Sequence, residues 1–196
     1  MDPELRLEQT SHGTQVYYRG RALYGPNPEP DAGRRAGATA IPPDTLVLWP
    51  SPLVWHGWRE LDAAACGSTR IVAMEADPIL FELARRTRPA DLGGHFSLVR
   101  ATASDVLAEL RRNGEHSFRR VVEITTSAAS LAHRTSYRSL RDLAQREIRV
   151  FWQNRLTLSA MGRLWIRNLV ENIPLLLDAD ALPSLAGPVF VCGAGP

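Results

Sequence analysis

Short apolar runs alternate with amphipathic segments between Thr45 and Arg149, and this alternation restricts the fold more than any other feature of the chain. Strands separated by helices in this way form βαβ units, whose strands run parallel and whose connections are right-handed. The four predicted strands are residues 45–49, 70–74, 96–100 and 121–125. We therefore expect an α/β, Rossmann-like domain over residues 45–150, with a doubly wound and mostly parallel sheet.

Helical periodicity and capping residues indicate the helices between and after these strands. Asp77 followed by Pro78 predicts a capped helix start, and Ser104 predicts a second one for a helix that runs to Arg112. The predicted helices are residues 54–66, a segment that begins at Pro78, 104–112, 139–149 and 151–173.

The segments on either side of this domain follow other patterns. Residues 1–44 predict a small β-hairpin element over 4–24, and then a Gly-, Pro- and Ala-rich linker with one short helical turn. Residues 151–187 predict a helical junction. Residues 188–196 combine an apolar strand with a Gly-x-Gly-Pro turn, which we interpret as the start of a truncated second domain.

Composition excludes several classes of enzyme. The chain has 196 residues with no lysine, so its 23 basic residues are all arginine. This excludes P-loop lysine, Schiff-base and pyridoxal phosphate chemistry. Two cysteines and five scattered histidines predict neither a disulfide framework nor a metal site. A polar N-terminus and the absence of an apolar run of ~20 residues favour a cytoplasmic protein without membrane contact.

Positive charge is concentrated in residues 111–167, which carry 12 arginines and four acidic residues, for a net charge of 12 − 4 = +8. We interpret this mainly as a solvated helix surface. A surface for an acidic partner is the alternative. No nucleic-acid motif accompanies the arginines, so we expect no nucleic-acid partner. The sequence leaves homo-oligomerisation open.

Two places in the sequence are candidate binding sites. Glu75 and Asp77 follow the second strand, where a Rossmann domain holds ribose hydroxyls; helix capping by Asp77 is the alternative. The turn after the first strand has two prolines and no glycine, so we expect no tightly bound cofactor. Gly193 and Gly195 could contact phosphate in the second domain. We predict no catalytic residue and no metal ligand.

Several segments resemble one family. The matching residues are Leu23–Gly25, Pro28–Ala32, Ile71–Leu80, the helix residues Thr157, Trp165, Asn168 and Asn172, and the final Gly193, Gly195 and Pro196. They are similar to the N-terminal region of the motility-associated factor glycosyltransferases, whose central domain is also described as 6-hydroxymethylpterin diphosphokinase MptE-like. We expect Trp165 to be a core residue of the junction, with both asparagines bonded to backbone; contact of these three residues with substrate is the alternative.

The resemblance implies a function for a parent protein: transfer of a nonulosonic acid from a CMP-sugar to a flagellin-like acceptor. This chain would then be a non-catalytic part that positions the acceptor or a partner, or supports the transferase domain. Whether the chain itself is an enzyme stays open. One alternative is an S-adenosylmethionine-dependent methyltransferase, and another is an Arg-rich interaction module.

Overall fold

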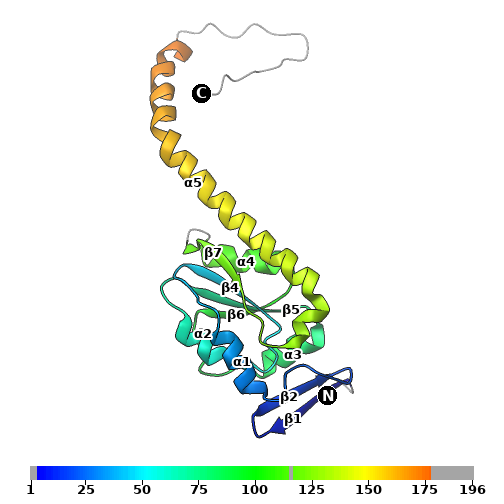
Figure 1. The fold of residues 1–196 in the computed structure, drawn as a ribbon. Helices are drawn as coiled ribbons and strands as arrows, with labels where there is room; N and C mark the ends of the chain where they lie inside the picture. The colour runs from blue at the N-terminus through cyan, green and yellow to red at the C-terminus, as the bar shows by residue number, and fades with distance from the viewer. Residues whose placement is uncertain (1–3, 115–116, 178–196) are drawn as a thin grey trace, which may run out of the picture. The chain divides into compact units, whose positions relative to one another are not determined.

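The computed structural model describes residues 4–114 and 117–177 and confirms the α/β fold (Figure 1). Its larger sheet has four parallel strands in the order β6-β5-β4-β7. Their bounds, close to the predicted ones, are Thr45–Pro50 for β4, Arg70–Glu75 for β5, Phe96–Arg100 for β6 and Arg120–Glu123 for β7.

The sheet is covered on both faces, which explains why its central strands are mostly apolar. Every residue of β4 is buried. Leu46 and Leu48 of β4 pack with residues of α4 (Ala103–Arg112) and of α5 (Arg134–Leu177). Val47 and Trp49 point to the opposite face and pack with residues of α1 (Pro28–Gly37) and α2 (Trp58–Ala64). The alternation of side chains along one strand therefore supplies both cores.

Two helix starts test the predicted caps. Asp77 caps α3 (Pro78–Arg86) as predicted, because its side chain accepts hydrogen bonds from the N–H groups of Ile79 and Leu80. The prediction that Ser104 caps the next helix is wrong. Thr102 is the N-cap of α4 and accepts from the Asp105 N–H at 3.2 Å. Both residues can cap, and the extended backbone of Thr102 decides between them.

Helix α1 corrects the prediction of a linker with one short helical turn. Pro28 occupies the first turn, where its missing N–H costs nothing, and acidic residues precede basic ones along the helix. Ala32 and Ala36 are completely buried on one face. Gly57, at the start of α2, permits the close approach of the two helices. A Cβ on Gly57 would lie 3.0 Å from the Ala32 carbonyl oxygen.

The predicted N-terminal hairpin is present as a separate antiparallel sheet. It comprises β1 (Leu5–Thr10), β2 (Gly13–Tyr18) and β3 (Arg21–Ala22), in the order β1-β2-β3. Its buried side chains pack with Leu53 from the loop after β4 and with Leu80 and Leu83 of α3. The hairpin therefore lies against the segments that follow β4 and β5.

Helix α5 is continuous from Arg134 to Leu177, whereas the sequence predicted separate helices over 139–149 and 151–173. No glycine or proline lies between the two predicted segments, so nothing interrupts the hydrogen bonding. The chain divides into two compact units, Met1–Gln153 and Asn154–Pro196. Among the described residues, no helix has the length and apolar character needed to cross a membrane.

In the second unit, the described residues are the last part of α5. Trp165 is 42% exposed there, so it is not a core residue of the part of the chain that the structure describes. The predicted strand and the turn with Gly193 and Gly195 lie outside the described residues.

Candidate functional site

The candidate site is the carboxyl edge of the parallel sheet. The strand order reverses beside β4, because β5 and β6 follow on one side and β7 lies on the other. In open α/β sheets the crevice at such a reversal is the usual ligand site. Three segments meet there: the loop after β4 that begins at Ser51, the end of β5 with Glu75 and Asp77, and the residues after β7.

The loop after β4 has left-handed backbone conformations at three residues other than glycine. Ser51, Leu53 and Trp55 have φ values of 52°, 51° and 64°. Each such residue costs of order 1–3 kcal/mol, so surrounding contacts must hold it. The Ser51 N–H donates to the Met74 carbonyl at 2.9 Å, and the Trp55 indole N–H donates to the Ala84 carbonyl at 2.7 Å.

The side chains of Ser51, Leu53 and Trp55 are completely buried. In a glycine-rich turn this backbone would leave space for a cofactor. Here Ser51 contacts the Tyr137 hydroxyl, Leu53 packs with the hairpin and α3, and Trp55 packs against Trp49 in the core. The left-handed residues also delay the next helix. Helix α2 begins at Trp58, not at residue 54 as predicted.

Glu75 is the last residue of β5 and is only 1% exposed. Its Oε1 accepts hydrogen bonds from the Ala76 N–H at 2.8 Å, the Asp77 N–H at 2.9 Å and the Tyr137 hydroxyl at 3.1 Å. Its Oε2 is buried and has no hydrogen-bond partner among the described residues. The sequence interpretation of Glu75 as a candidate ribose ligand missed this buried position.

Tyr137 of α5 covers the Glu75 carboxyl group. Its hydroxyl contacts Glu75, accepts from the Ala76 N–H at 3.1 Å and lies 3.0 Å from the Ser51 Oγ. Tyr137 is 1% exposed. One hydroxyl thus joins the ends of β4 and β5. A ribose hydroxyl beside Glu75 would make the same kinds of contact, so Tyr137 occupies that position in this conformation.

The protonation of this cluster depends on burial. Burial raises the pKa of the Glu75 carboxyl above its ordinary value, and hydrogen bonds from the Asp77 N–H and the Tyr137 hydroxyl oppose the rise. Burial also raises the pKa of the Tyr137 hydroxyl, and the charge of Glu75 adds to that rise. The tyrosine therefore stays protonated and remains a donor to the carboxylate.

Asp77 has both carboxyl oxygens in use. Oδ1 caps α3, and Oδ2 accepts from the Tyr18 hydroxyl of the hairpin at 2.9 Å. Burial and the hydrogen bond to Asp77 raise the pKa of Tyr18 to about 12. Asp77 therefore caps α3, as predicted, and also contacts the hairpin.

A surface hollow of about 580 Å³ lies beside the contact between Tyr18 and Asp77. Arg19, Arg21 and His133 contribute basic groups to its lining, Tyr18 and the acidic Asp77 also line it, and the remaining lining residues are apolar. Arg19 already forms an ion pair with Glu4 at 2.8 Å. The lining therefore carries charges of both signs.

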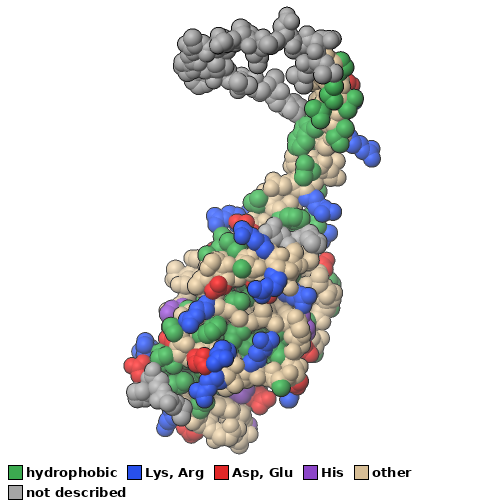
Figure 2. Space-filling view, turned by 180° about the vertical axis from the view of Figure 1, so that it is seen from behind, with side chains coloured by type: hydrophobic (Ala, Val, Ile, Leu, Met, Phe, Trp, Pro, Cys, Tyr) green, Lys and Arg blue, Asp and Glu red, His purple; other side chains and the backbone are tan. Residues whose placement is uncertain are grey.

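Metal binding has no support among the described residues, where no three His, Cys, Asp or Glu side chains gather in a ligand set. Basic side chains are spread over the face seen in Figure 2, with acidic ones between them. Within the Arg-rich segment, Arg141 lies 2.9 Å from Asp142 and 3.9 Å from Glu123, and Arg119 stacks on Trp152.

No family model matches the chain. It is 30% identical over 201 residues to an uncharacterized protein of Treponema pallidum (strain Nichols). The match covers 97% of this chain and 35% of that protein. The chain therefore spans about a third of the length of this relative.

Proposed function

We propose that this chain is a non-catalytic part of a larger protein that resembles the motility-associated factor glycosyltransferases. Its role would be to position a flagellin-like acceptor or to support the domain that transfers the sugar. The observation that carries the proposal is the occupied crevice at the carboxyl edge of the sheet, where Tyr137 covers Glu75.

A nucleotide-binding Rossmann domain needs an open turn after its first strand and a free acidic group after its second. Neither is present in this conformation. Ser51 and Trp55 are buried within the turn, and the accepting oxygen of Glu75 already has three donors. A nucleotide would have to displace Tyr137 and lose its hydrogen bonds, so tight binding of a nucleotide or of S-adenosylmethionine is disfavoured.

The relative supports a role within a longer protein, because the similar region makes up 35% of its length. Under the family resemblance, a CMP-activated nonulosonic acid would bind to the transferase domain. Gly193 and Gly195 would belong to the start of that domain. The chain described here would then contribute to acceptor recognition and not to the transfer step.

Calorimetry on the full chain tests the occupied crevice directly. We expect S-adenosylmethionine and CMP-N-acetylneuraminic acid to bind with a Kd no lower than about 1 mM. This Kd corresponds to a free energy of binding of about −4 kcal/mol. An S-adenosylmethionine-binding Rossmann protein in the same buffer serves as the positive control. Micromolar binding of S-adenosylmethionine that disappears in Glu75→Ala would overturn the proposal and favour the methyltransferase alternative.

Acceptor positioning needs a second measurement, because a chain that binds no nucleotide could still have another role. Purified flagellin immobilised on a biosensor should bind the chain reversibly. Failure to bind flagellin would contradict acceptor positioning and leave support of the transferase domain. Steep loss of binding with added salt would assign the contact to the Arg-rich segment 111–167.

A further inference from the structure

Strand β1 is an edge strand among the described residues, since it pairs only with β2. The pairing determines which of its backbone groups face outward. The Arg19 N–H donates to the Glu4 carbonyl, so these two residues form a hydrogen-bonded pair in the antiparallel register. Such pairs alternate, and Arg6 and Glu8 therefore face β2 through their backbone. The N–H and C=O groups of Leu5, Leu7 and Gln9 point away from β2.

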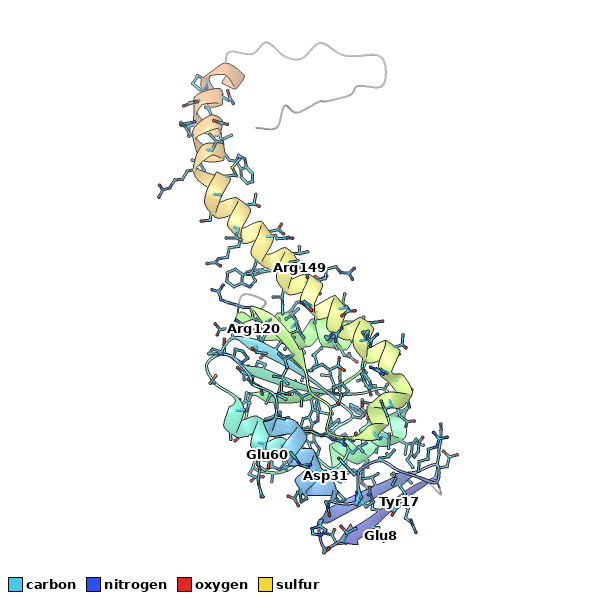
Figure 3. All side chains as sticks on the ribbon, viewed as in Figure 1. Glu8, Tyr17, Asp31, Glu60, Arg120 and Arg149 are labelled. Atoms are coloured by element: carbon cyan, nitrogen blue, oxygen red, sulfur yellow. The ribbon has the colours of Figure 1, made fainter. Side chains whose placement is uncertain are left out.

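The side chains of β1 differ between its two faces. Leu5 and Leu7 lie on the face that carries Val16 and Tyr18, and they line a hollow of about 430 Å³ together with residues of α3. Leu7 is 38% exposed. Arg6 and Glu8 lie on the other face, where Arg6 stacks on Tyr17 and contacts Glu8 at 3.4 Å. Figure 3 shows Glu8 and Tyr17 in the hairpin, near its outer strand.

A strand that adds antiparallel to this edge must complement each position. The residue opposite Leu7 should be apolar, and those opposite Arg6 and Glu8 should be acidic and basic. Read from its own N-terminus, the ideal partner is therefore basic, apolar and then acidic. This is the sequence Arg6-Leu7-Glu8 of β1 itself. The strand is complementary to a second copy of itself.

We propose that the chain forms a symmetric homodimer by antiparallel pairing of β1 with β1 of a second copy. Leu7 would lie opposite Leu7 of the second copy on the two-fold axis. Arg6 would lie opposite Glu8, and Leu5 opposite Gln9. This register also satisfies the backbone, because the outward-facing residues 5, 7 and 9 of one copy meet 9, 7 and 5 of the other. The two three-stranded sheets then form one continuous sheet.

The dimer is weak because the contact is confined to one strand and the side chains beside it. Interfaces of such small area dissociate readily and depend on protein concentration. The hollow beside Leu5 and Leu7 leaves space on the apolar face for the leucine of the second copy. Dimerisation would also cover Leu7 and the open backbone groups, which otherwise favour aggregation.

Sedimentation velocity on the full chain, over a concentration series into the high micromolar range, measures the dimer. Gln9→Pro removes an outward N–H and leaves the hydrogen bonds from β1 to β2 in place. We expect it to weaken the dimer about tenfold or more, because each copy loses one interface bond. Gln9→Ala is the matched control and should retain the dimer. Circular dichroism establishes that each variant is folded.

Charge reversal provides a second, independent test of the register. Arg6→Glu places acids opposite one another and should weaken the dimer about tenfold, and Glu8→Arg alone should act similarly. The double variant Arg6→Glu/Glu8→Arg restores opposite charges and should restore the dimer. A chain that stays monomeric throughout, or a dimer that survives both Gln9→Pro and Arg6→Glu, would overturn the proposal. Either of these two results would leave the predictions for nucleotide binding and flagellin binding unchanged.

Discussion

Replacing Tyr137 by phenylalanine removes one buried hydroxyl and keeps the ring that packs against the sheet. The hydroxyl makes three contacts within 3.1 Å, to Glu75, the Ala76 N–H and Ser51. The Ala76 N–H keeps its bond to Glu75, whereas the buried Ser51 hydroxyl loses this partner. With a net value near 1 kcal/mol for each bond and partial compensation at Ala76, we expect a loss of about 2 kcal/mol in the free energy of unfolding.

Urea denaturation followed by tryptophan fluorescence and circular dichroism measures this loss. At a slope of about 2 kcal/mol/M, the midpoint of Tyr137→Phe should fall by about 1 M. Tyr17→Phe is the matched control. Tyr17 is half-buried and its hydroxyl has no hydrogen bond among the described residues, so its change should stay within about 0.5 kcal/mol. Equal small losses in both variants would refute the conclusion that Tyr137 joins β4 and β5 through its hydroxyl.

Four further substitutions probe the same domain. Because burial raises the pKa of Glu75, the native state holds the proton of this carboxyl group more tightly than the unfolded state does. The resulting stabilisation of the native state is complete below the ordinary glutamate pKa and disappears as pH rises through the raised pKa. Glu75→Gln should therefore remove this pH-dependent decline in the free energy of unfolding, measured by urea denaturation over a pH series. Thr102→Ala should cost about 1 kcal/mol in urea denaturation, whereas Ser104→Ala should cost less than half of that, and the reverse order would contradict the observed cap. Trp55→Phe leaves the Ala84 carbonyl without its indole donor and opens space in the core, so its thermal midpoint should fall by several degrees; an unchanged midpoint would show that the loop does not depend on this contact.

Local patterns were enough to predict the elements whose causes are local. Apolar runs predict strands over 45–49 and 70–74, within one residue of β4 and β5, and Asp77 before Pro78 predicts the start of α3. Helix α1 was missed because Gly, Pro and Ala are typical of loops. Its small residues become favourable only when another helix packs closely against them, as α2 does at Gly57.

The sequence by itself determined the strand–helix alternation, the hairpin and the acidic residues at the end of β5. Only the tertiary structure showed that the crevice is occupied. Tyr137 is 62 residues from Glu75 along the chain, and no local pattern connects a tyrosine near the start of a helix with a distant carboxylate. The contact exists because β4 and β5 bring Ser51 and Glu75 to one edge while α5 packs across the same face. Burial then removes water from the carboxylate and makes the hydroxyl its partner.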